Sequence, residues 1–232
     1  ALKAASKNDC LLTLGIKPSR PDTGYGYIQY LDNSISEETA EVKKVKTFTE
    51  KPNLEIAKSF LASGDFLWNS GIFIWSLNSI MNAFKQDLND VDALFAEGIG
   101  IYNTPNESDF IEKTYAVCKN ISIDYGIMEK ADNVFVLAVD FGWSDLGTWG
   151  SLYDIRDKDE NSNAVMGNNV MFYDTKKCIV NVPKDKLVVL QGLSDYIIVE
   201  DNNTLLVCRK EDEQQIRQFV KDVKLDKGEQ YV

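Results

Sequence analysis

Histidine is absent from this chain of 232 residues. Its absence removes the commonest general base, the Ser–His and Cys–His nucleophile pairs, and most zinc sites. Any catalytic mechanism for this chain therefore has to work without an imidazole.

Basic residues are few, because 25 Lys and Arg stand against 36 Asp and Glu, for a net charge of −11. The basic residues are also scattered, whereas proteins that bind nucleic acid or anionic membranes cluster them. No apolar run approaches the roughly 20 residues of a membrane span. The first ten residues lack the long apolar core of a signal peptide. We therefore expect no nucleic-acid partner and no membrane partner.

Cysteine is also scarce, and the four cysteines are Cys10, Cys118, Cys178 and Cys208. They lie far apart in the sequence and form no C-x-x-C pair. Such cysteines are typical of reduced, mostly buried thiols. The composition therefore predicts a cytoplasmic protein.

Strand and helix patterns alternate over the first 160 residues. The apolar runs "CLLTLGIKP" and "VFVLAV" predict buried strands, and "SGIFIWSL" predicts a third. Between them, Asn53 and Gly64 stand where a helix cap and a helix terminator belong. We expect residues 1–160 to form part of a Rossmann-like α/β domain, with helices and a mixed, mostly parallel sheet.

The pattern changes after the polar linker "RDKDENSNAVMGN", residues 156–168. Short strands then recur, separated by turn-forming residues: "VMFYD", "CIVNV", "KLVVLQG", "DYIIVED" and "TLLVCRK". This spacing predicts a small β-rich domain over residues 161–232, ending in an amphipathic helix. A β-helix is one architecture that fits.

Two polar stretches border the predicted strands of the first domain. In "TGYGY", residues 23–27, Gly26 would let the backbone approach a ligand, and Tyr25 offers an amphipathic wall for a sugar. In "TEKP", residues 49–52, Glu50 can accept two sugar hydroxyls and Lys51 can meet a phosphate. The structural alternatives are a hairpin with packed tyrosines and a solvated ion pair.

Three further side chains have both a binding and a structural interpretation. Asn69 in "WNSGIFIW" enters an apolar strand, where it binds a ligand or forms an Asx-turn. Asp124 in "SIDYGIMEK" stands in a predicted helical turn, where the helix dipole is sufficient reason for it. Asp145 in "GWSDLG" is predicted at the start of a helix capped by Ser144, where the helix dipole would again be a structural reason for it. Ligands of open α/β sheets bind at the carboxyl ends of strands, where these stretches are expected to converge.

Read in order, these stretches resemble the sugar-1-phosphate nucleotidyltransferases, and most closely the mannose-1-phosphate guanylyltransferases. The matching stretches are "RPDTGYGYI", "FTEKP", "FLWNSGIFIW", "SIDYGIMEK", "DFGWSDLGTW" and, near the C-terminus, "YIIVEDNNTLLVCRKEDEQQIR". The resemblance covers nearly the whole chain. It implies that GTP and mannose 1-phosphate are converted to GDP-mannose and pyrophosphate.

The resemblance also implies roles for particular residues. Tyr25 and Gly26 would border the sugar, and Glu50 and Asn69 would contact it, with Asp124 as a further binding residue. Lys51 would meet the sugar phosphate as a catalytic and binding residue. Asp145 would be catalytic as a Mg²⁺ ligand, which makes Mg²⁺ the expected cofactor, and Trp143 and Trp149 would wall the tight turn that carries it. The nucleophile is then a phosphate oxygen that is already deprotonated, so no general base is needed.

One departure concerns the glycine-rich loop that holds the nucleotide phosphates in this family. The only glycines before residue 64 are Gly15, Gly24 and Gly26, so this loop is missing from the chain. We therefore expect the chain to be the second half of the enzyme, inactive alone, with GTP bound mainly by the missing half. Core surface left exposed would favour a homodimer.

Two alternatives remain open at this point. One is a nucleotidyltransferase for another sugar and base, such as a glucose-1-phosphate thymidylyltransferase. The other is a sugar-phosphate-binding module without catalytic activity. A panel of substrates separates the first alternative, and a glycine-rich loop encoded upstream would dismiss the second.

Overall fold

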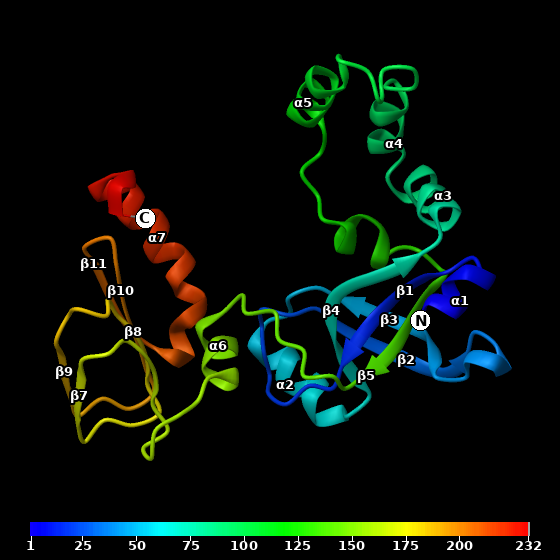
Figure 1. Ribbon diagram of the computed structural model, residues 1–232. Coiled ribbons are helices and arrows are strands. Elements are labelled where there is room, and N and C mark those ends of the chain that lie inside the picture. The colour runs from blue at the N-terminus through cyan, green and yellow to red at the C-terminus, as the bar shows by residue number, and fades with distance from the viewer. Residues whose placement is uncertain (232) are drawn as a thin grey trace. The chain divides into compact units, whose positions relative to one another are not determined.

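A computed structural model describes residues 1–231, and the chain forms two compact units (Figure 1). The first unit is Ala1–Trp143 and the second begins at Ser144. This division falls earlier than the predicted boundary between residues 160 and 161. The reason is helix α6 (Trp149–Ile155), whose apolar side chains pack in the core of the second unit.

The strands of the first unit form a closed ring in the order β1-β4-β2-β3-β5. Their bounds are β1 (Leu11–Ile16), β2 (Tyr27–Ser34), β3 (Val42–Thr49), β4 (Phe66–Trp75) and β5 (Val134–Val139). Strand β5 closes the ring because it pairs with β1 on one side and with β3 on the other.

The predicted α/β class is confirmed, but the strand directions differ from the expectation of a mostly parallel sheet. Within this ring only β1 and β5 pair in parallel, and the other pairs are antiparallel. One cause is that β2 and β3 are joined by the short segment 35–41, whereas parallel neighbours need a long crossover.

Helices and short helical turns connect the strands of the first unit. Their bounds are α1 (Leu2–Lys7), α2 (Leu54–Ser63), α3 (Leu77–Asp87), α4 (Asn89–Ala96) and α5 (Glu107–Val117), with the short turns η1 (Glu37–Thr39) and η2 (Asp124–Met128). Helix α2 has both predicted caps, since Asn53 accepts the Ile56 N–H and Gly64 is left-handed with φ 77°. Helices α3 and α4 are separated at buried Leu88, where φ is −135° and ψ is 49°.

Strand β1 is largely buried in the first unit. Leu11 packs on one side with Ile28, Leu67 and Ile127, and the next residue, Leu12, packs on the opposite side in another cluster. Because successive strand residues point to opposite faces, β1 is buried on both faces. These cores fix the frame on which the polar residues are held.

The second unit is a β-helix followed by a helix. Strands β6 (Ala164–Met166), β8 (Ile179–Asn181) and β10 (Tyr196–Asp201) are parallel in one sheet, and β7 (Val170–Tyr173) pairs in parallel with β9 (Val188–Gln191) in another. Strand β11 (Thr204–Arg209) adds antiparallel to β10 and is followed by η3 (Lys210–Gln215), α7 (Ile216–Lys227) and η4 (Glu229–Tyr231). The predicted β-rich domain is therefore confirmed, although β6 falls inside the predicted linker. Across residues 1–231 no helix has the length and apolar character that crossing a membrane requires.

Candidate functional site

The register of three neighbouring strands brings the predicted sugar-binding residues together. Tyr27 of β2 pairs with Thr49 of β3 and with Trp68 of β4. The residues next to Tyr27, Thr49 and Trp68 in the chain are Gly26, Glu50 and Asn69, respectively. The antiparallel register therefore places these three side by side, in one row across the strands. The Gly26 carbonyl accepts the Asn69 N–H at 2.8 Å, which closes the row on one side.

Gly26 is the position at which the backbone and the Glu50 carboxylate approach each other. A Cβ at this glycine would lie 2.4 Å from Glu50 Oε2 and 3.3 Å from Asn69 Cβ. The first distance is shorter than any ordinary contact, so only glycine leaves room for the carboxylate in this position. The close approach predicted for the "TGYGY" turn is therefore made to a side chain of the protein itself.

The Glu50 carboxylate is buried, and its two oxygens differ. Oε1 lies 2.6 Å from Lys51 Nζ, whereas buried Oε2 accepts no hydrogen bond from residues 1–231. The Glu50 side chain is only 8% exposed. Burial raises the pKa of Glu50, hydrogen bonding to Lys51 opposes that shift, and the nearby charges of Asp124 and Glu129 add to it. A buried acceptor without a partner is costly, which favours a ligand hydroxyl at Oε2.

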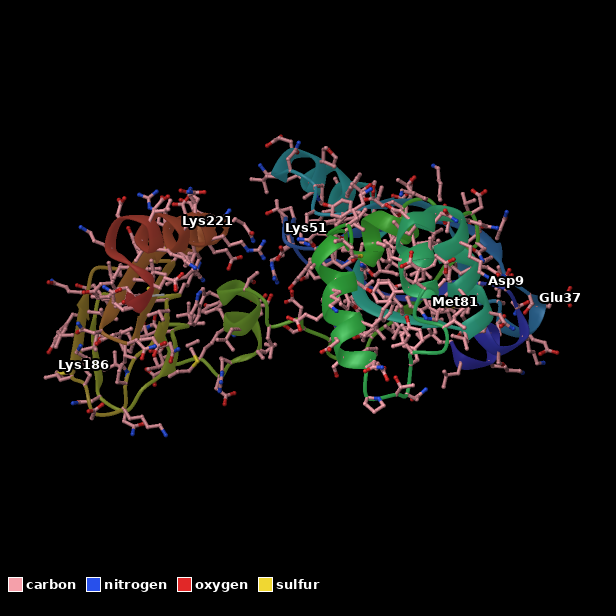
Figure 2. The ribbon with its side chains drawn as sticks, turned by 90° about the horizontal axis from the view of Figure 1, so that it is seen from above. Asp9, Glu37, Lys51, Met81, Lys186 and Lys221 are labelled. Atoms are coloured by element: carbon pink, nitrogen blue, oxygen red, sulfur yellow. The ribbon has the colours of Figure 1, made fainter. Side chains whose placement is uncertain are left out.

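Lys51 places its ammonium group beside this carboxylate at the surface of the first unit (Figure 2). Its backbone is left-handed, with φ 46°, a conformation that costs a non-glycine residue energy and is found at binding sites. The hydrogen bond to Glu50 raises the pKa of Lys51, so its positive charge is retained. The arrangement supplies one cation next to a sugar-hydroxyl acceptor.

The Asn69 amide is held in one orientation by residues from three elements. Its Oδ1 accepts the hydroxyl of Thr13 at 3.0 Å and the Gly71 N–H at 3.2 Å, and its Nδ2 donates to Asp124 Oδ1 at 2.9 Å. The bond from Gly71 is the Asx-type contact that we considered as an alternative. The bond to Asp124 goes further, because it joins this residue to the same row as Glu50.

Tyr25 is more deeply packed than the other members of the site. The residue is 5% exposed, and its ring meets the rings of Trp68 and Trp143 edge-on, at centroid distances of 4.9 and 5.5 Å. The Arg20 guanidinium lies 5.4 Å from the Trp68 ring. This is the packing alternative stated for the tyrosines, and it anchors the turn that carries Gly26.

Asp145 belongs to the second unit and lies outside any helix. The predicted helix capped by Ser144 is wrong in its start, since α6 begins at Trp149 and Thr148 is its cap, with the Thr148 hydroxyl accepting the Ser151 N–H at 3.1 Å. The helix dipole therefore does not explain Asp145, whose exposed carboxylate accepts the Gly147 N–H at 3.1 Å. Trp143 and Trp149 do not wall one turn either, because they pack in the cores of different units.

Two residues of the site were missed by sequence analysis. Thr13 is a buried hydroxyl in the apolar strand "LLTLGI", and this isolated polar residue was the signal that could have revealed it. Glu129 accepts the Glu50 N–H at 3.1 Å, and its place inside the stretch "SIDYGIMEK" was the signal that could have revealed it.

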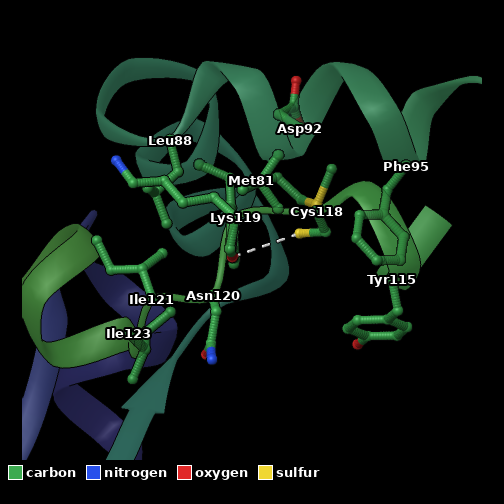
Figure 3. Close-up of a pocket in the computed structure, with 12 residues that line it drawn as sticks. Met81, Leu88, Asp92, Phe95, Tyr115, Cys118, Lys119, Asn120, Ile121 and Ile123 are labelled. Carbon is green, nitrogen blue, oxygen red and sulfur yellow. Dashed lines mark hydrogen bonds between the residues drawn. The ribbon is translucent and has the colours of Figure 1, made fainter.

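Two hollows lie elsewhere in the first unit. One, of about 670 Å³, is lined mainly by apolar side chains of α3, α4 and α5 and by residues 118–123, with Phe95 and Tyr115 on one side (Figure 3). The other, of about 600 Å³, lies where the parallel strands β1 and β5 end, beside Lys17 and Asp140. None of the predicted site residues lines either hollow, so the site is defined by its converging polar groups.

The first unit is a ring of strands that carries the row of Glu50, Lys51 and Asn69, and the second unit contains a β-helix. The chain belongs to the nucleotidyl transferase family, whose profile matches residues 1–162. The profile of the mannose-phosphate isomerase/GMP-like β-helix domain matches residues 167–223.

Curated relatives and a solved structure agree with this membership. A mannose-1-phosphate guanylyltransferase of Escherichia coli is 33% identical over 93% of this chain, and the alginate biosynthesis protein AlgA of Pseudomonas aeruginosa is 33% identical over 96%. In both cases 46% of the relative is covered, so the chain spans about half the length of the curated relatives it matches. A crystal structure described as mannose-1-phosphate geranyltransferase from Thermus thermophilus superposes with a TM-score of 0.80 at 28% identity, covering 96% of this chain and 62% of that one.

Proposed function

We propose that this chain carries the sugar-phosphate site of a mannose-1-phosphate guanylyltransferase. The observation that carries the proposal is the buried Glu50 Oε2, which accepts no hydrogen bond from residues 1–231 and lies against Gly26. Beside it stand the Lys51 ammonium and the Asn69–Asp124 pair. Carboxylate and amide groups next to one cation suit a ligand with hydroxyls at one end and a phosphate at the other.

The reaction joins mannose 1-phosphate to the GMP part of GTP and releases pyrophosphate. A phosphate oxygen of mannose 1-phosphate forms a bond to the α-phosphorus of GTP, and the bond from that phosphorus to pyrophosphate breaks. The attacking oxygen carries no proton near neutral pH, so a chain without histidine needs no general base. Glu50 and Asn69 hold the sugar hydroxyls, Lys51 offsets phosphate charge, and catalysis rests on position and charge neutralisation.

Mg²⁺ is the metal that this chemistry implies, and Asp145 is the residue that would hold it. Within residues 1–231, no group of three or more His, Cys, Asp or Glu side chains is placed to bind a metal. One exposed carboxylate still fits Mg²⁺, which takes only one or two carboxylates from protein and completes its shell with water and phosphate. When bound, the ion supplies charge neutralisation on the phosphates.

The proposal is tested by assaying the protein expressed from its complete reading frame for pyrophosphate release. We expect mannose 1-phosphate with GTP to exceed glucose 1-phosphate with dTTP at least about tenfold in kcat/KM. The reverse order would favour the thymidylyltransferase alternative. Tight binding of mannose 1-phosphate without turnover of any nucleotide would favour a binding module.

Gly26→Ala should weaken sugar-phosphate binding without unfolding the protein. The new methyl group would meet Glu50 Oε2 at 2.4 Å, and the flexible end of that side chain would move aside. We expect the KM for mannose 1-phosphate to rise about tenfold, the cost of one lost charged hydrogen bond. Gly64→Ala serves as a control at the residue that ends α2, where a Cβ meets nothing within 4 Å and the strain of φ 77° affects only stability. An unchanged KM in Gly26→Ala would contradict the position given to Glu50.

A further inference from the structure

The turn η2 is a π-helix rather than an α-helix. The Glu129 N–H donates to the Asp124 carbonyl at 3.0 Å, which joins residues five apart. Such π-turns are rare and frequently occur at functional sites. In an α-helix of 3.6 residues per turn, residues five apart are rotated by about 140°, so they face different sides. The π-turn instead stacks Asp124 and Glu129 one turn apart.

Both ends of this turn contact the proposed sugar-phosphate site. At its start, Asp124 Oδ1 accepts the Asn69 amide Nδ2 at 2.9 Å. Just after its end, Glu129 Oε1 accepts the Glu50 backbone N–H at 3.1 Å. One short element therefore fixes the side chain of one proposed ligand-binding residue and the backbone of another.

The turn is itself anchored in the apolar core. Ile127 is fully buried and Met128 is 2% exposed, and both pack in the cluster that contains Leu11. A Cβ on Gly126 would lie 2.6 Å from Leu88 Cδ1, so glycine allows the turn to press closely against that side chain. The polar ends are therefore carried by a platform whose position the core sets.

We propose that η2 is a positioning element for sugar-phosphate binding and that Glu129 is a positioning residue, which acts through the backbone of Glu50. This inference rests on the proposed function and deepens it. The bond from Glu50 N–H fixes the chain immediately before Lys51, whose left-handed backbone directs the ammonium toward the Glu50 carboxylate. Loss of the Glu129 acceptor frees this two-residue segment, so the carboxylate and the ammonium lose their joint orientation.

Glu129→Ala and Glu129→Gln test this role in the protein expressed from its complete reading frame. Glu129→Ala removes the acceptor, and we expect a KM for mannose 1-phosphate about fivefold higher, with kcat and the KM for GTP within about twofold of wild type. Glu129→Gln keeps an Oε1 acceptor, so its constants should stay within about twofold of wild type. Glu112→Ala, an exposed glutamate on α5, is the matched control.

Three results would overturn the inference. They are an unchanged KM in Glu129→Ala, an equal loss in kcat and in both KM values, and a Glu129→Gln variant as impaired as Glu129→Ala. Calorimetric titration with mannose 1-phosphate separates this inference from the proposed function. If neither the wild-type protein nor any variant turns over GTP, the proposed function fails. A fivefold rise in the Kd for mannose 1-phosphate that is seen in Glu129→Ala but not in Glu129→Gln still supports the positioning role.

Discussion

Asp145→Asn should lower kcat by at least about 10²-fold, because several kcal/mol of charge stabilisation by the metal depend on a carboxylate ligand. The asparagine keeps an oxygen that can accept the Gly147 N–H, so the irregular segment before α6 retains its hydrogen bond. The melting temperature should therefore change little. The measurement is kcat as a function of Mg²⁺ concentration, together with thermal unfolding of both proteins.

Asp185→Asn is the matched control for this prediction, since it removes one exposed carboxylate from a turn of the β-helix. We expect wild-type kcat and wild-type Mg²⁺ dependence in the control. A kcat for Asp145→Asn within about threefold of wild type would remove Asp145 from the metal site.

Glu50→Gln should raise the KM for mannose 1-phosphate by about 10- to 100-fold, which is the value of a hydrogen bond to a charged acceptor. The glutamine preserves the shape of the side chain beside Gly26 but removes the charge that holds Lys51 at 2.6 Å. The KM for GTP should stay close to wild type. Steady-state kinetics with each substrate varied in turn give both constants, and a larger effect on GTP would contradict the role of Glu50.

The raised pKa of Glu50 gives the same residue a pH signature. As pH falls through this pKa, which burial holds above the ordinary glutamate value, the carboxylate is protonated and sugar-phosphate binding weakens. The ratio of 1/KM in wild type to that in Glu50→Gln should therefore decrease toward acid pH. Ionisation of the sugar phosphate occurs in both proteins and cancels in the ratio. A ratio independent of pH would contradict this account.

Stability should show the opposite dependence. Because the folded-state pKa is raised, the folded protein binds more protons than the unfolded chain between the ordinary and the raised value. The free energy of unfolding contributed by Glu50 therefore falls as pH rises through that window. Denaturant titrations of wild type and Glu50→Gln across the same pH range give the two free energies of unfolding. The difference between these free energies should change with pH only inside that window.

Of the residues expected to converge, Glu50, Asn69 and Asp124 of the first unit do lie together, whereas Asp145 belongs to the second unit. We expected Glu50 and Asn69 to meet because parallel strands end at a common edge. They meet instead because Tyr27 pairs with Thr49 and with Trp68 in antiparallel register. The adjacent residues Gly26, Glu50 and Asn69 are therefore aligned as well. Hydrophobic runs locate strands well, whereas the direction and register of pairing depend on partners distant in the sequence.

Local capping patterns gave mixed results. Asn53 and Gly64 bound helix α2 as predicted, because a cap and a terminator are set by adjacent residues. Ser144 and Thr148 both precede a helix-like pattern, and only the structure shows that Thr148 is the cap. Glu129 lies inside the quoted stretch "SIDYGIMEK", but its role follows from a contact with the Glu50 backbone that the sequence does not show.

The most direct test of the site is a crystal structure of the protein with mannose 1-phosphate bound. We predict sugar hydroxyls within about 3 Å of Glu50 Oε2 and the phosphate beside Lys51 Nζ. A sugar phosphate bound elsewhere in the first unit, with Glu50 Oε2 still lacking a hydrogen-bond donor, would contradict the account.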